Sequence, residues 1–399
     1  MKTICFCNSA IAWGGGEKWH LDAALSLAGR GWRVFLLCHP RGALYARARE
    51  QAGTVRSVPL PVGRLSFLNP LFMGRLIRFF LREKPEAVIL NLPADLKSGG
   101  LAAKAAGVTR ILMRRGSALP VRNSAFNRYL YGRVITRLIV NSQATRRMIF
   151  RNNARLLPPG RVSVLPNGLD QAAFDQAMDR CARDLEKGTL RGPLADLARL
   201  PRPERPLVLG NAGRLNRQKG QHLFLHLGRR LLDAGVDCRL VIAGSGEREG
   251  ELRLLAGRLE LEEKVLFAGF QEDLSCFWQA VDLFVLTSLW EGFGFVLLEA
   301  MLARKPVLAF RVSNIPELVS DGVNGLLFPL PEEERRNAPD LPACDDWGRS
   351  FPGMEMAEEV AKLSRVAERR QAMGRAGRAF AEAGFSQSAC MDRLEALLK

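Results

Sequence analysis

The sequence predicts an α/β protein that is built from two doubly wound, Rossmann-like domains in series. The chain has 399 residues, which is ample for two domains with a hydrophobic core each. Short apolar runs alternate with helical stretches over residues 1–170, and the alternation starts afresh at residue 207. Each series opens with a strand that runs into a glycine-containing loop, which is how Rossmann-like units begin.

The first domain begins with a strand at Thr3–Asn8, a glycine-rich loop at Trp13–Trp19, a helix at Glu17–Gly29 and a strand at Arg33–Cys38. Since these elements of the fold start at once, we interpret the first residues as mature sequence and not as a signal peptide. The loop lacks the G-x-G-x-x-G spacing and no acidic residue ends the second strand, so a dinucleotide site is poorly supported. Further strands are expected at Val55–Leu60, Ala87–Leu92, Arg110–Met113, Leu138–Asn141 and Val162–Leu165.

Residues 64–85 mix aromatic and aliphatic side chains with basic ones. This pattern fits an amphipathic helix on a membrane surface, and it equally fits an ordinary packed helix with solvated arginines. The basic residues are Arg64, Arg75, Arg78, Arg82 and Lys84.

The second domain is expected over residues 207–384. Residues 171–206 are charged and then proline-rich, so we interpret them as a helical linker. Residues 329–353 are acidic and proline-bearing, so we interpret them as an inserted loop, and helix follows from Met354 to Leu398. The strands are expected at Leu207–Gly213, Arg239–Ala243, Val265–Gly269, Leu283–Thr287, Pro306–Phe310 and Gly325–Phe328.

No metal site or membrane span is expected. Eight scattered cysteines without a C-x-x-C pair indicate reduced thiols of a cytosolic protein. His222 and His226 lie one helical turn apart without a third ligand, and the Asp345–Asp346 pair falls in the inserted loop and not beside a strand end. No apolar run reaches the 18 residues that a transmembrane helix needs.

The stretch SLWEGFGFVLLEAMLARKP, residues 288–306, carries two glutamates, Glu291 and Glu299, on either side of a strand-to-helix loop. Gly292 and Gly294 let the main chain approach a ligand, and the helix that they open presents N–H groups suited to phosphate. The carboxylate of Glu299, early in that helix, could accept hydrogen bonds from sugar hydroxyls. Taken alone, the two residues could equally be ordinary surface glutamates.

This stretch resembles the E-x7-E signature of the retaining glycosyltransferase family 4, whose members have the GT-B fold. The resemblance implies that Glu299 binds the ribose hydroxyls of the nucleotide and that Glu291 lies near the donor sugar and phosphate. It also implies that a C-terminal helix, at about residues 385–399, crosses back to the first domain. The matching residues are Glu291, Gly292, Gly294, Glu299, Ala300, Lys305 and Pro306.

Other motifs extend the resemblance over nearly the whole chain. GNAGRLNRQKG, residues 210–220, resembles the family's G-R-x4-K-G element, which implies that Arg214 and Lys219 neutralise the donor diphosphate. Cations aimed at a departing diphosphate stabilise the transition state more than the ground state. The resemblance also places Gly15 and Gly16 near the donor phosphate and acceptor. The remaining residues expected around the nucleotide are Gly244, Phe270, Gly292, Phe293 and Gly294.

Three arginines, Arg114, Arg115 and Arg122, follow a predicted strand, and we expect them to converge at its carboxyl end. Many family members have a histidine close to this point, whereas the histidines here are at positions 20, 39, 222 and 226. Either the arginines bind phosphates or carboxylates of the acceptor, or the position has another role.

Charge is divided unevenly along the chain. Residues 1–170 hold 27 Lys and Arg against 7 Asp and Glu, a net charge of +20, whereas the remainder has a net charge of −3. Such a field favours a polyanionic partner or an anionic membrane surface. Among the acceptors that the family serves, bacterial lipopolysaccharide core fits best.

The sequence therefore predicts a cytoplasmic enzyme at the inner face of the membrane. It would take a nucleotide-sugar, with a UDP-sugar as the expected donor, and need no cofactor or metal ion. Two alternatives stay open: a sugar-nucleotide epimerase or phosphorylase on a similar fold, and a nucleic-acid-binding protein. The second is disfavoured because no stacking module or nucleic-acid motif is present.

Overall fold

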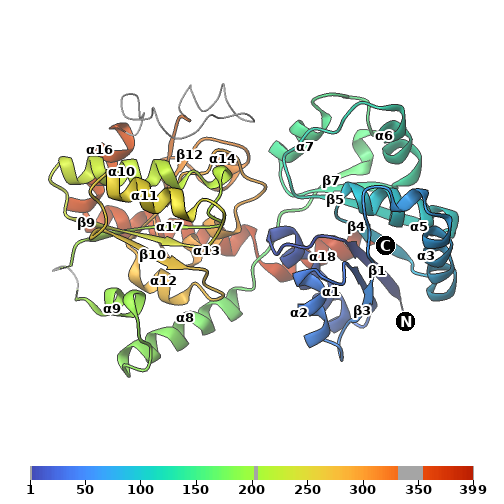
Figure 1. Ribbon diagram of the computed structural model, residues 1–399, viewed down its shortest axis with the longest axis horizontal. Coiled ribbons are helices and arrows are strands. Elements are labelled where there is room, and N and C mark those ends of the chain that lie inside the picture. The colour runs from blue at the N-terminus through green and yellow to red at the C-terminus, as the bar shows by residue number, and fades with distance from the viewer. Residues whose placement is uncertain (1, 202–204, 331–353, 399) are drawn as a thin grey trace. The chain divides into compact units, whose positions relative to one another are not determined.

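The structure is a computed structural model that describes residues 2–201, 205–330 and 354–398 (Figure 1). It divides into unit 1, residues 1–168 and 387–399, and unit 2, residues 169–386. The inserted loop expected at residues 329–353 lies outside the described residues, apart from Pro329 and Leu330.

Unit 1 is built on a seven-stranded sheet of order β3-β2-β1-β4-β5-β6-β7, in which every pair is parallel. Strands such as Thr3–Asn8 are apolar almost throughout, because helices cover both faces of the sheet. The strands are β1 (Thr3–Asn8), β2 (Arg33–Cys38), β3 (Arg56–Pro59), β4 (Ala87–Leu90), β5 (Arg110–Arg115), β6 (Arg137–Val140) and β7 (Val162–Val164).

Helices alternate with these strands, and local chemistry fixes where several of them begin. The side chain of Asn69 accepts hydrogen bonds from the N–H groups of Leu71 and Phe72 at 3.0 and 3.1 Å, and Pro70 takes the first helical position of α3. The main helices of unit 1 are α1 (Gly15–Gly29), α2 (Ala43–Glu50), α3 (Pro70–Glu83), α5 (Leu101–Ala105), α6 (Ala125–Tyr129), α7 (Gln143–Phe150) and α18 (Gln387–Leu398). Shorter turns are η1 (Ser66–Leu68), α4 (Pro93–Asp95), η2 (Leu96–Gly100), η3 (Leu130–Val134) and η4 (Pro159–Arg161).

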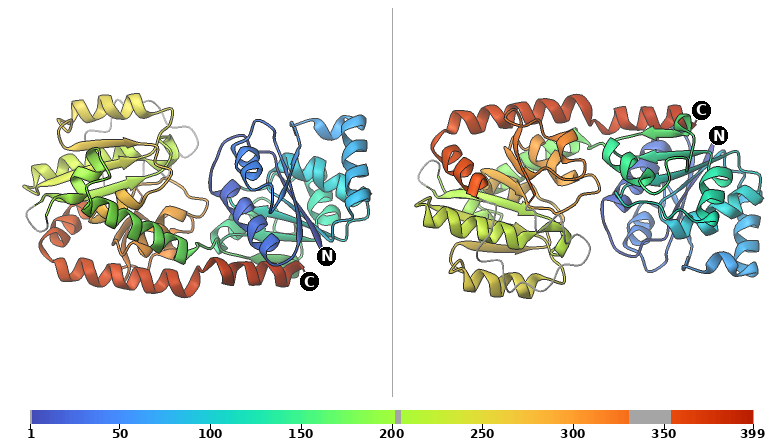
Figure 2. Two further views of the ribbon diagram at one scale, coloured as in Figure 1. Left: turned by 90° about the horizontal axis from the view of Figure 1, so that it is seen from below. Right: turned by 90° about the horizontal axis from the view of Figure 1, so that it is seen from above.

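The last helix, α18, belongs to unit 1, as the crossing C-terminal helix of the GT-B fold requires (Figure 2). It packs beside α1, where Arg30 Nη1 lies 2.5 Å from Asp392 Oδ1, and Trp32 Nε1 donates to Glu395 Oε1 at 3.4 Å. The expectation that the chain's final helix returns to the first domain is therefore confirmed.

Unit 2 repeats the architecture with a six-stranded parallel sheet of order β10-β9-β8-β11-β12-β13. Its strands are β8 (Leu207–Ala212), β9 (Cys238–Ala243), β10 (Val265–Gly269), β11 (Leu283–Leu286), β12 (Val307–Phe310) and β13 (Gly325–Phe328). Its helices are α8 (Gln171–Glu186), α9 (Pro193–Arg199), η5 (Arg217–Lys219), α10 (Gln221–Asp233), α11 (Glu249–Arg258), α12 (Ser275–Ala280), α13 (Phe295–Leu302), α14 (Ile315–Leu318), α16 (Met354–Arg365) and α17 (Ala367–Gly384).

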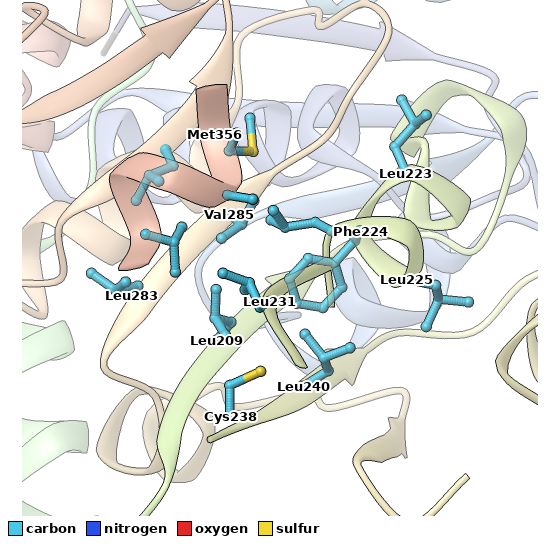
Figure 3. Packing of buried hydrophobic residues seen from close by; sticks show 14 of the residues in the cluster. Leu209, Leu223, Phe224, Leu225, Leu231, Cys238, Leu240, Leu283, Val285 and Met356 are labelled. Atoms are coloured by element: carbon cyan, nitrogen blue, oxygen red, sulfur yellow. The ribbon is translucent and has the colours of Figure 1, made fainter. Parts of the chain in front are cut away.

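Two hydrophobic cores lie on the two faces of the unit 2 sheet. On β11, Leu283 and Val285 join the core under α10 and α16 (Figure 3), whereas Phe284 and Leu286 join the core under α12 and α13. Alternate strand residues thus point to opposite faces and both faces are buried. This is the doubly wound arrangement that the sequence predicts.

The segment expected as a linker, residues 171–206, contributes to unit 2. Its helices α8 and α9 both pack against α12, and α9 places Leu194 and Leu197 in the core beneath it. In α8, Asp175 accepts hydrogen bonds from Arg378 Nη1 and Nη2 of α17 at 2.8 and 2.6 Å. The charged residues of this segment belong to the solvent-exposed face of α8, because a helix that packs one of its faces on a domain leaves its opposite face in water.

Candidate functional site

The candidate site of unit 2 forms where the strand order reverses. Strands β8 and β11 lie side by side in the sheet although six elements (η5, α10, β9, α11, β10 and α12) separate them in the chain. The connections that leave their carboxyl ends run in opposite directions, and open α/β sheets bind ligands at such a point. Lys219 follows β8 and Glu291 follows β11, so the sheet order brings the two together.

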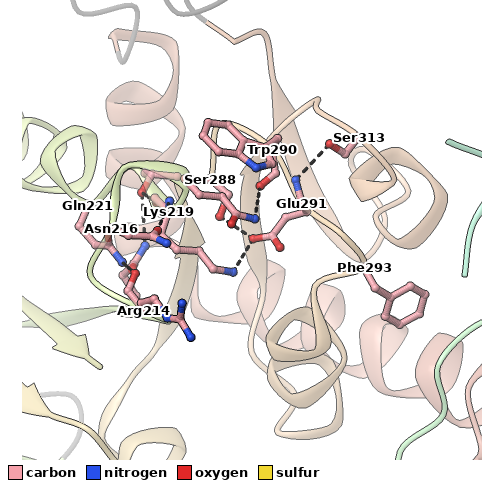
Figure 4. A network of polar contacts seen from close by, with 12 residues as sticks. Arg214, Asn216, Lys219, Gln221, Ser288, Trp290, Glu291, Phe293 and Ser313 are labelled. Carbon is pink, nitrogen blue, oxygen red and sulfur yellow. Dashed lines mark hydrogen bonds and ion pairs between the residues drawn. The ribbon is translucent and has the colours of Figure 1, made fainter. Parts of the chain in front are cut away.

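Lys219 and Glu291 form a close ion pair, with 2.6 Å between Nζ and Oε1 (Figure 4). The Ser288 hydroxyl donates to the same carboxylate oxygen at 2.6 Å, and the Glu291 N–H donates to Ser313 Oγ at 3.1 Å. Glu291 is only 4% exposed. A carboxylate with two donors on one oxygen and a fixed main chain has one orientation, so the pair is preorganised.

The loop that carries Lys219 is held directly against the end of β11. The Thr287 hydroxyl donates to the Lys219 carbonyl at 3.1 Å, and the Asn216 side chain accepts from the Lys219 N–H at 3.3 Å. Gly220 has φ 61°, and a Cβ there would lie 2.2 Å from the Thr287 carbonyl oxygen. Only glycine permits both this conformation and this close contact with Thr287. The ion pair therefore depends on a glycine at position 220.

Arg214 and Gly244 lie on two neighbouring loops that touch through their main chains. Gly244 has φ 145°, and a Cβ there would lie 1.9 Å from the Gly213 carbonyl oxygen, next to Arg214. The Arg214 side chain is exposed, while its carbonyl accepts from Gln221 Nε2 at 3.1 Å. Phe270, just beyond β10, is 63% exposed. These residues therefore present an exposed cation and an exposed aromatic ring.

The helix α13 begins at the glycine turn that the sequence predicts. Gly294, with φ 83°, precedes its first residue and, as a glycine, contributes no capping side chain to the start of the helix. Gly292 is half-buried, and Glu299, the fifth residue of α13, is also half-buried. The start of α13 thus offers main-chain donors beside Glu291, as the sequence predicts.

Phe293 was expected among the residues around the nucleotide, and its side chain lies in the core of unit 2. The ring is 5% exposed and points away from the polar network in Figure 4. It packs against Phe295 and Phe385, with ring centroids 5.8 and 6.0 Å away, and its carbonyl accepts from Asn314 Nδ2 at 2.7 Å. Its side chain anchors the glycine turn to the core of unit 2.

The three arginines of unit 1 do not converge. Arg114 is 2% exposed and donates from Nη2 to Asn167 Oδ1 at 2.8 Å. Arg115, also buried, donates to the Leu119 carbonyl at 3.2 Å, whereas Arg122 is exposed. Burial lowers the pKa of Arg114 to about 10, and the charge of Glu17 acts in the opposite sense.

Polar residues that the sequence analysis did not single out surround Arg114. Glu17 Oε1 accepts hydrogen bonds from Asn8 Nδ2 at 3.4 Å and from Asn91 Nδ2 at 3.2 Å. Gly16 lies beside them, since a Cβ there would be 3.5 Å from the Asn91 side chain. Asn8 and Asn91 lie at the carboxyl ends of apolar strand runs. This position in the sequence is the feature that could have identified them as candidate ligand-binding residues.

Two general features bear on the chemistry. Within the three ranges that the structure describes, no group of three or more His, Cys, Asp or Glu residues could hold a metal ion. None of the helices in those ranges is long and apolar enough to cross a membrane.

Two family models match the chain, one in each unit. The model described as Glycosyltransferase Family 4 matches residues 13–173, and the model described as Glycosyl transferases group 1 matches residues 195–337. Together they include the Lys219–Glu291 pair of unit 2 and the residues around Arg114 in unit 1.

Curated relatives match over different lengths. The chain is 30% identical to alpha-D-kanosaminyltransferase of Streptomyces kanamyceticus, over 49% of this chain and 46% of that protein. It is 28% identical to putative glycosyltransferase EpsF of Bacillus subtilis, over 64% of this chain and 63% of that protein. It is 29% identical to the lipopolysaccharide core biosynthesis glycosyltransferase LpsE of Rhizobium meliloti, over 80% of this chain and 83% of that protein. The chain thus spans less than two thirds of the first two relatives.

Solved structures resemble the whole chain. A crystal structure of Anabaena HepE in complex with UDP has a TM-score of 0.77 and 20% identity, and covers 100% of this chain and 99% of that one. The structure of the lipopolysaccharide outer core galactosyltransferase WaaB has a TM-score of 0.68 and 16% identity, and covers 99% of this chain and 98% of that one. At these identities the likeness shows the fold, which is GT-B.

Proposed function

We propose, from the premise that this chain is a glycosyltransferase carrying a Family 4 domain and a group 1 domain, that it transfers a sugar from a nucleotide-sugar to an anionic glycolipid. The proposed donor is a UDP-sugar, and the proposed acceptor is lipopolysaccharide core. The proposed reaction retains the configuration of the sugar, with the incoming and leaving groups on one face.

The observation that carries the proposal is the Lys219–Glu291 ion pair at the reversal of strand order. Its 2.6 Å separation and the low exposure of Glu291 fix a cation and a carboxylate at the start of α13. A nucleoside diphosphate gains negative charge as the glycosidic bond breaks, and preorganised cations and helix N–H groups stabilise that charge at little cost in reorganisation. A nucleotide-sugar is the ligand that this arrangement suits.

Each donor residue has a role in this proposal. Arg214 and Lys219 neutralise the diphosphate, and Glu291 lies near the donor sugar. Glu299 binds the ribose hydroxyls, and Phe270 packs near the base. The main chain of the glycine turns, at Gly244 and at residues 292–294, approaches the phosphates.

The acceptor proposal rests on charge and on exposed apolar side chains. The +20 charge of residues 1–170 favours an acidic, phosphorylated glycolipid at an anionic bilayer. Leu65 and Leu68, in the turn before α3, and Leu71, in its first turn, are exposed in the same segment as Arg64 and Arg75. We propose that residues 64–84 face the inner surface of the membrane, and that Arg114, Arg115 and Arg122 serve the acceptor. Two of the curated relatives, LpsE and the mannosyltransferase LpsB, are named for lipopolysaccharide core biosynthesis.

A thermal-shift screen with UDP-, GDP- and ADP-sugars tests the donor proposal. A ligand at a hundred times its dissociation constant stabilises the folded state by about 2.7 kcal/mol, which is readily detected. We expect stabilisation by one nucleotide class, followed by transfer to lipopolysaccharide with a truncated core. Absence of stabilisation by all three classes would contradict the proposal.

A further inference from the structure

We infer that unit 1 contains a ligand site beneath its glycine loop, which binds an oxyanion of the substrate at Arg114 beside a hydroxyl at Glu17. The inference rests on the proposed function, because it names the chemistry of the substrate group that unit 1 receives. It goes beyond the three-arginine acceptor contact, because it separates Arg114 from Arg115 and Arg122 and adds residues of opposite charge.

The site lies where the strand order of unit 1 reverses. Strands β1 and β4 are neighbours in the sheet, and the chain leaves their carboxyl ends in opposite directions. Asn8 is the last residue of β1, Asn91 follows β4, and Arg114 lies near the end of the adjacent β5. The position corresponds within unit 1 to that of the Lys219–Glu291 pair within unit 2, and open α/β sheets place ligands there.

Arg114 is held in place but not satisfied. Its guanidinium lies over the Trp19 ring, 4.4 Å from the ring centroid, and Nη2 donates to Asn167. Nη1 is buried and has no hydrogen-bond acceptor among the residues that the structure describes. A buried donor of a charged group costs free energy when it lacks an acceptor, and a phosphate or carboxylate oxygen is its strongest partner. The fixed guanidinium with one open donor is therefore suited to an oxyanion.

Glu17 defines the other half of the site. Asn8 and Asn91 both donate to Oε1, so Oε1 is occupied. Oε2 faces the glycine loop, since a Cβ on Gly14 would lie 3.3 Å from it. A second anion would be repelled there, whereas a sugar hydroxyl would donate to it. The matching ligand carries an oxyanion and a hydroxyl close together, as sugar acids and sugar phosphates do.

The glycine loop covers the site and allows entry. Nη1 lies 3.9 Å from the position that a Cβ on Gly16 would take, and α1 starts there without a side-chain cap on its N–H groups. Because Nη1 is buried, a ligand reaches it only when the loop shifts. Three consecutive glycines, at positions 14–16, make such a shift sterically easy. The uncapped N–H groups of α1 then add donors for the oxyanion.

Gly16→Ala fills the site without disturbing the fold. The new methyl group would lie 3.5 Å from Asn91 and 3.9 Å from Arg114 Nη1, which are ordinary contacts, and it occupies the space that the oxyanion needs. Alanine is also a better helix former than glycine. Gly29→Ala is the matched control, because it makes the same change in the same helix and a Cβ there meets nothing within 4 Å.

The experiment uses full-length protein labelled with 5-fluorotryptophan and observed by fluorine NMR. Trp19 reports on Arg114, and Trp290, next to Glu291, reports on unit 2; each signal is assigned with a Trp→Phe variant. Glucuronate, inorganic phosphate and glucose are titrated separately, and UDP is added as a fourth ligand. Glucuronate tests a carboxylate source and phosphate tests a phosphate source.

We expect glucuronate, phosphate or both to shift the Trp19 signal, with glucose much weaker. Gly16→Ala and Arg114→Gln should weaken that binding at least tenfold, and Gly29→Ala should leave it unchanged. An unmoved Trp19 signal, an equal response to glucose, or unweakened binding in Gly16→Ala would overturn the inference. UDP reports separately through Trp290, so failure of the donor proposal is distinguished from failure of this site.

Discussion

Lys219 Nζ and Glu291 Oε1 lie 2.6 Å apart although 72 residues separate them in the sequence. The contact exists because the strand order places β8 beside β11, and because Gly220 lets the Lys219 loop rest on the Thr287 carbonyl. The same pair therefore contributes to the stability of unit 2 and to the proposed chemistry. Mutations can separate the two contributions.

Lys219→Met should destabilise the protein by about 3–5 kcal/mol, because it leaves the buried Glu291 carboxylate without its cation. The double variant Lys219→Met, Glu291→Gln should recover most of that loss. Both variants should lack sugar transfer. Urea unfolding of Lys219→Met, Glu291→Gln and the double variant measures the three losses of unfolding free energy. A loss in the double variant equal to the sum of the two single losses would contradict the coupling.

Glu299→Gln should weaken UDP binding at least tenfold, since a charge-assisted hydrogen bond to a ribose hydroxyl contributes about 1.5–3 kcal/mol. Calorimetric titration with UDP gives the affinity. Glu355→Gln, on the exposed surface of α16, is the control, and equal UDP affinities in the two variants would remove Glu299 from the site.

Asp95 should make the protein less stable as pH rises from about 4 to 7. It is fully buried, and although it accepts hydrogen bonds from the N–H groups of Ser9 and Leu92, burial raises its pKa to about 7. The folded state thus keeps a proton that the unfolded state releases near its ordinary pKa of 3.8. Stability present at low pH is lost through this window, by at most about 1.4 kcal/mol per pH unit.

The measurement for Asp95 compares unfolding free energies of the wild type and Asp95→Asn between pH 4 and 8. The difference between the two proteins should change with pH, because only the wild type has the titrating group. A constant difference across the range would show that Asp95 titrates normally in the fold.

Leu68→Ser with Leu71→Ser should weaken the affinity for anionic vesicles, measured by co-sedimentation, by at least about a hundredfold. The two side chains are 65% and 76% exposed beside basic residues of the same segment, and each exposed leucine buried in lipid contributes about 1.5–3 kcal/mol. Binding should also fall with added salt, since the Debye length is about 8 Å at physiological ionic strength. Leu254→Ser, in unit 2 and 69% exposed before the change, is the control and should bind vesicles normally.

Transfer activity should persist in EDTA. No D-x-D motif stands beside a strand end in the sequence, and Lys219 with Arg214 supplies positive charge where a metal ion would otherwise neutralise the diphosphate. The assay compares initial rates before and after chelation. Loss of activity that magnesium or manganese restores would refute this prediction.

The sequence predicted the parallel sheets and the position of most strands, because buried parallel strands are continuous apolar runs between helices. It also predicted the glycine turn before α13, where Gly294 has a positive φ. It could not show that Phe293 is a core residue, because a phenylalanine between two glycines looks the same whether its ring meets a ligand or Phe385. The contact with Phe385 spans residues that only the folded chain brings together.

The arginines of unit 1 show a second limit of sequence reasoning. Arg114 and Arg115 both lie at the end of one strand, and alternation along a strand sends neighbouring side chains to opposite faces. Arg114 therefore meets Asn167, whereas Arg115 meets the Leu119 carbonyl. The expectation that Arg114 and Arg115 converge was wrong for this geometric reason.

The place of α18 in unit 1 has a consequence for biosynthesis. Residues 387–398 are translated after all of unit 2, yet they bury Cys390, Met391 and Leu394 within unit 1. At about 5–20 residues per second, the ribosome needs on the order of tens of seconds to pass through unit 2. During that time unit 2 can complete its fold, whereas the surface of α1 that receives α18 stays bare, so the basic unit is the one that most needs chaperone protection as it emerges.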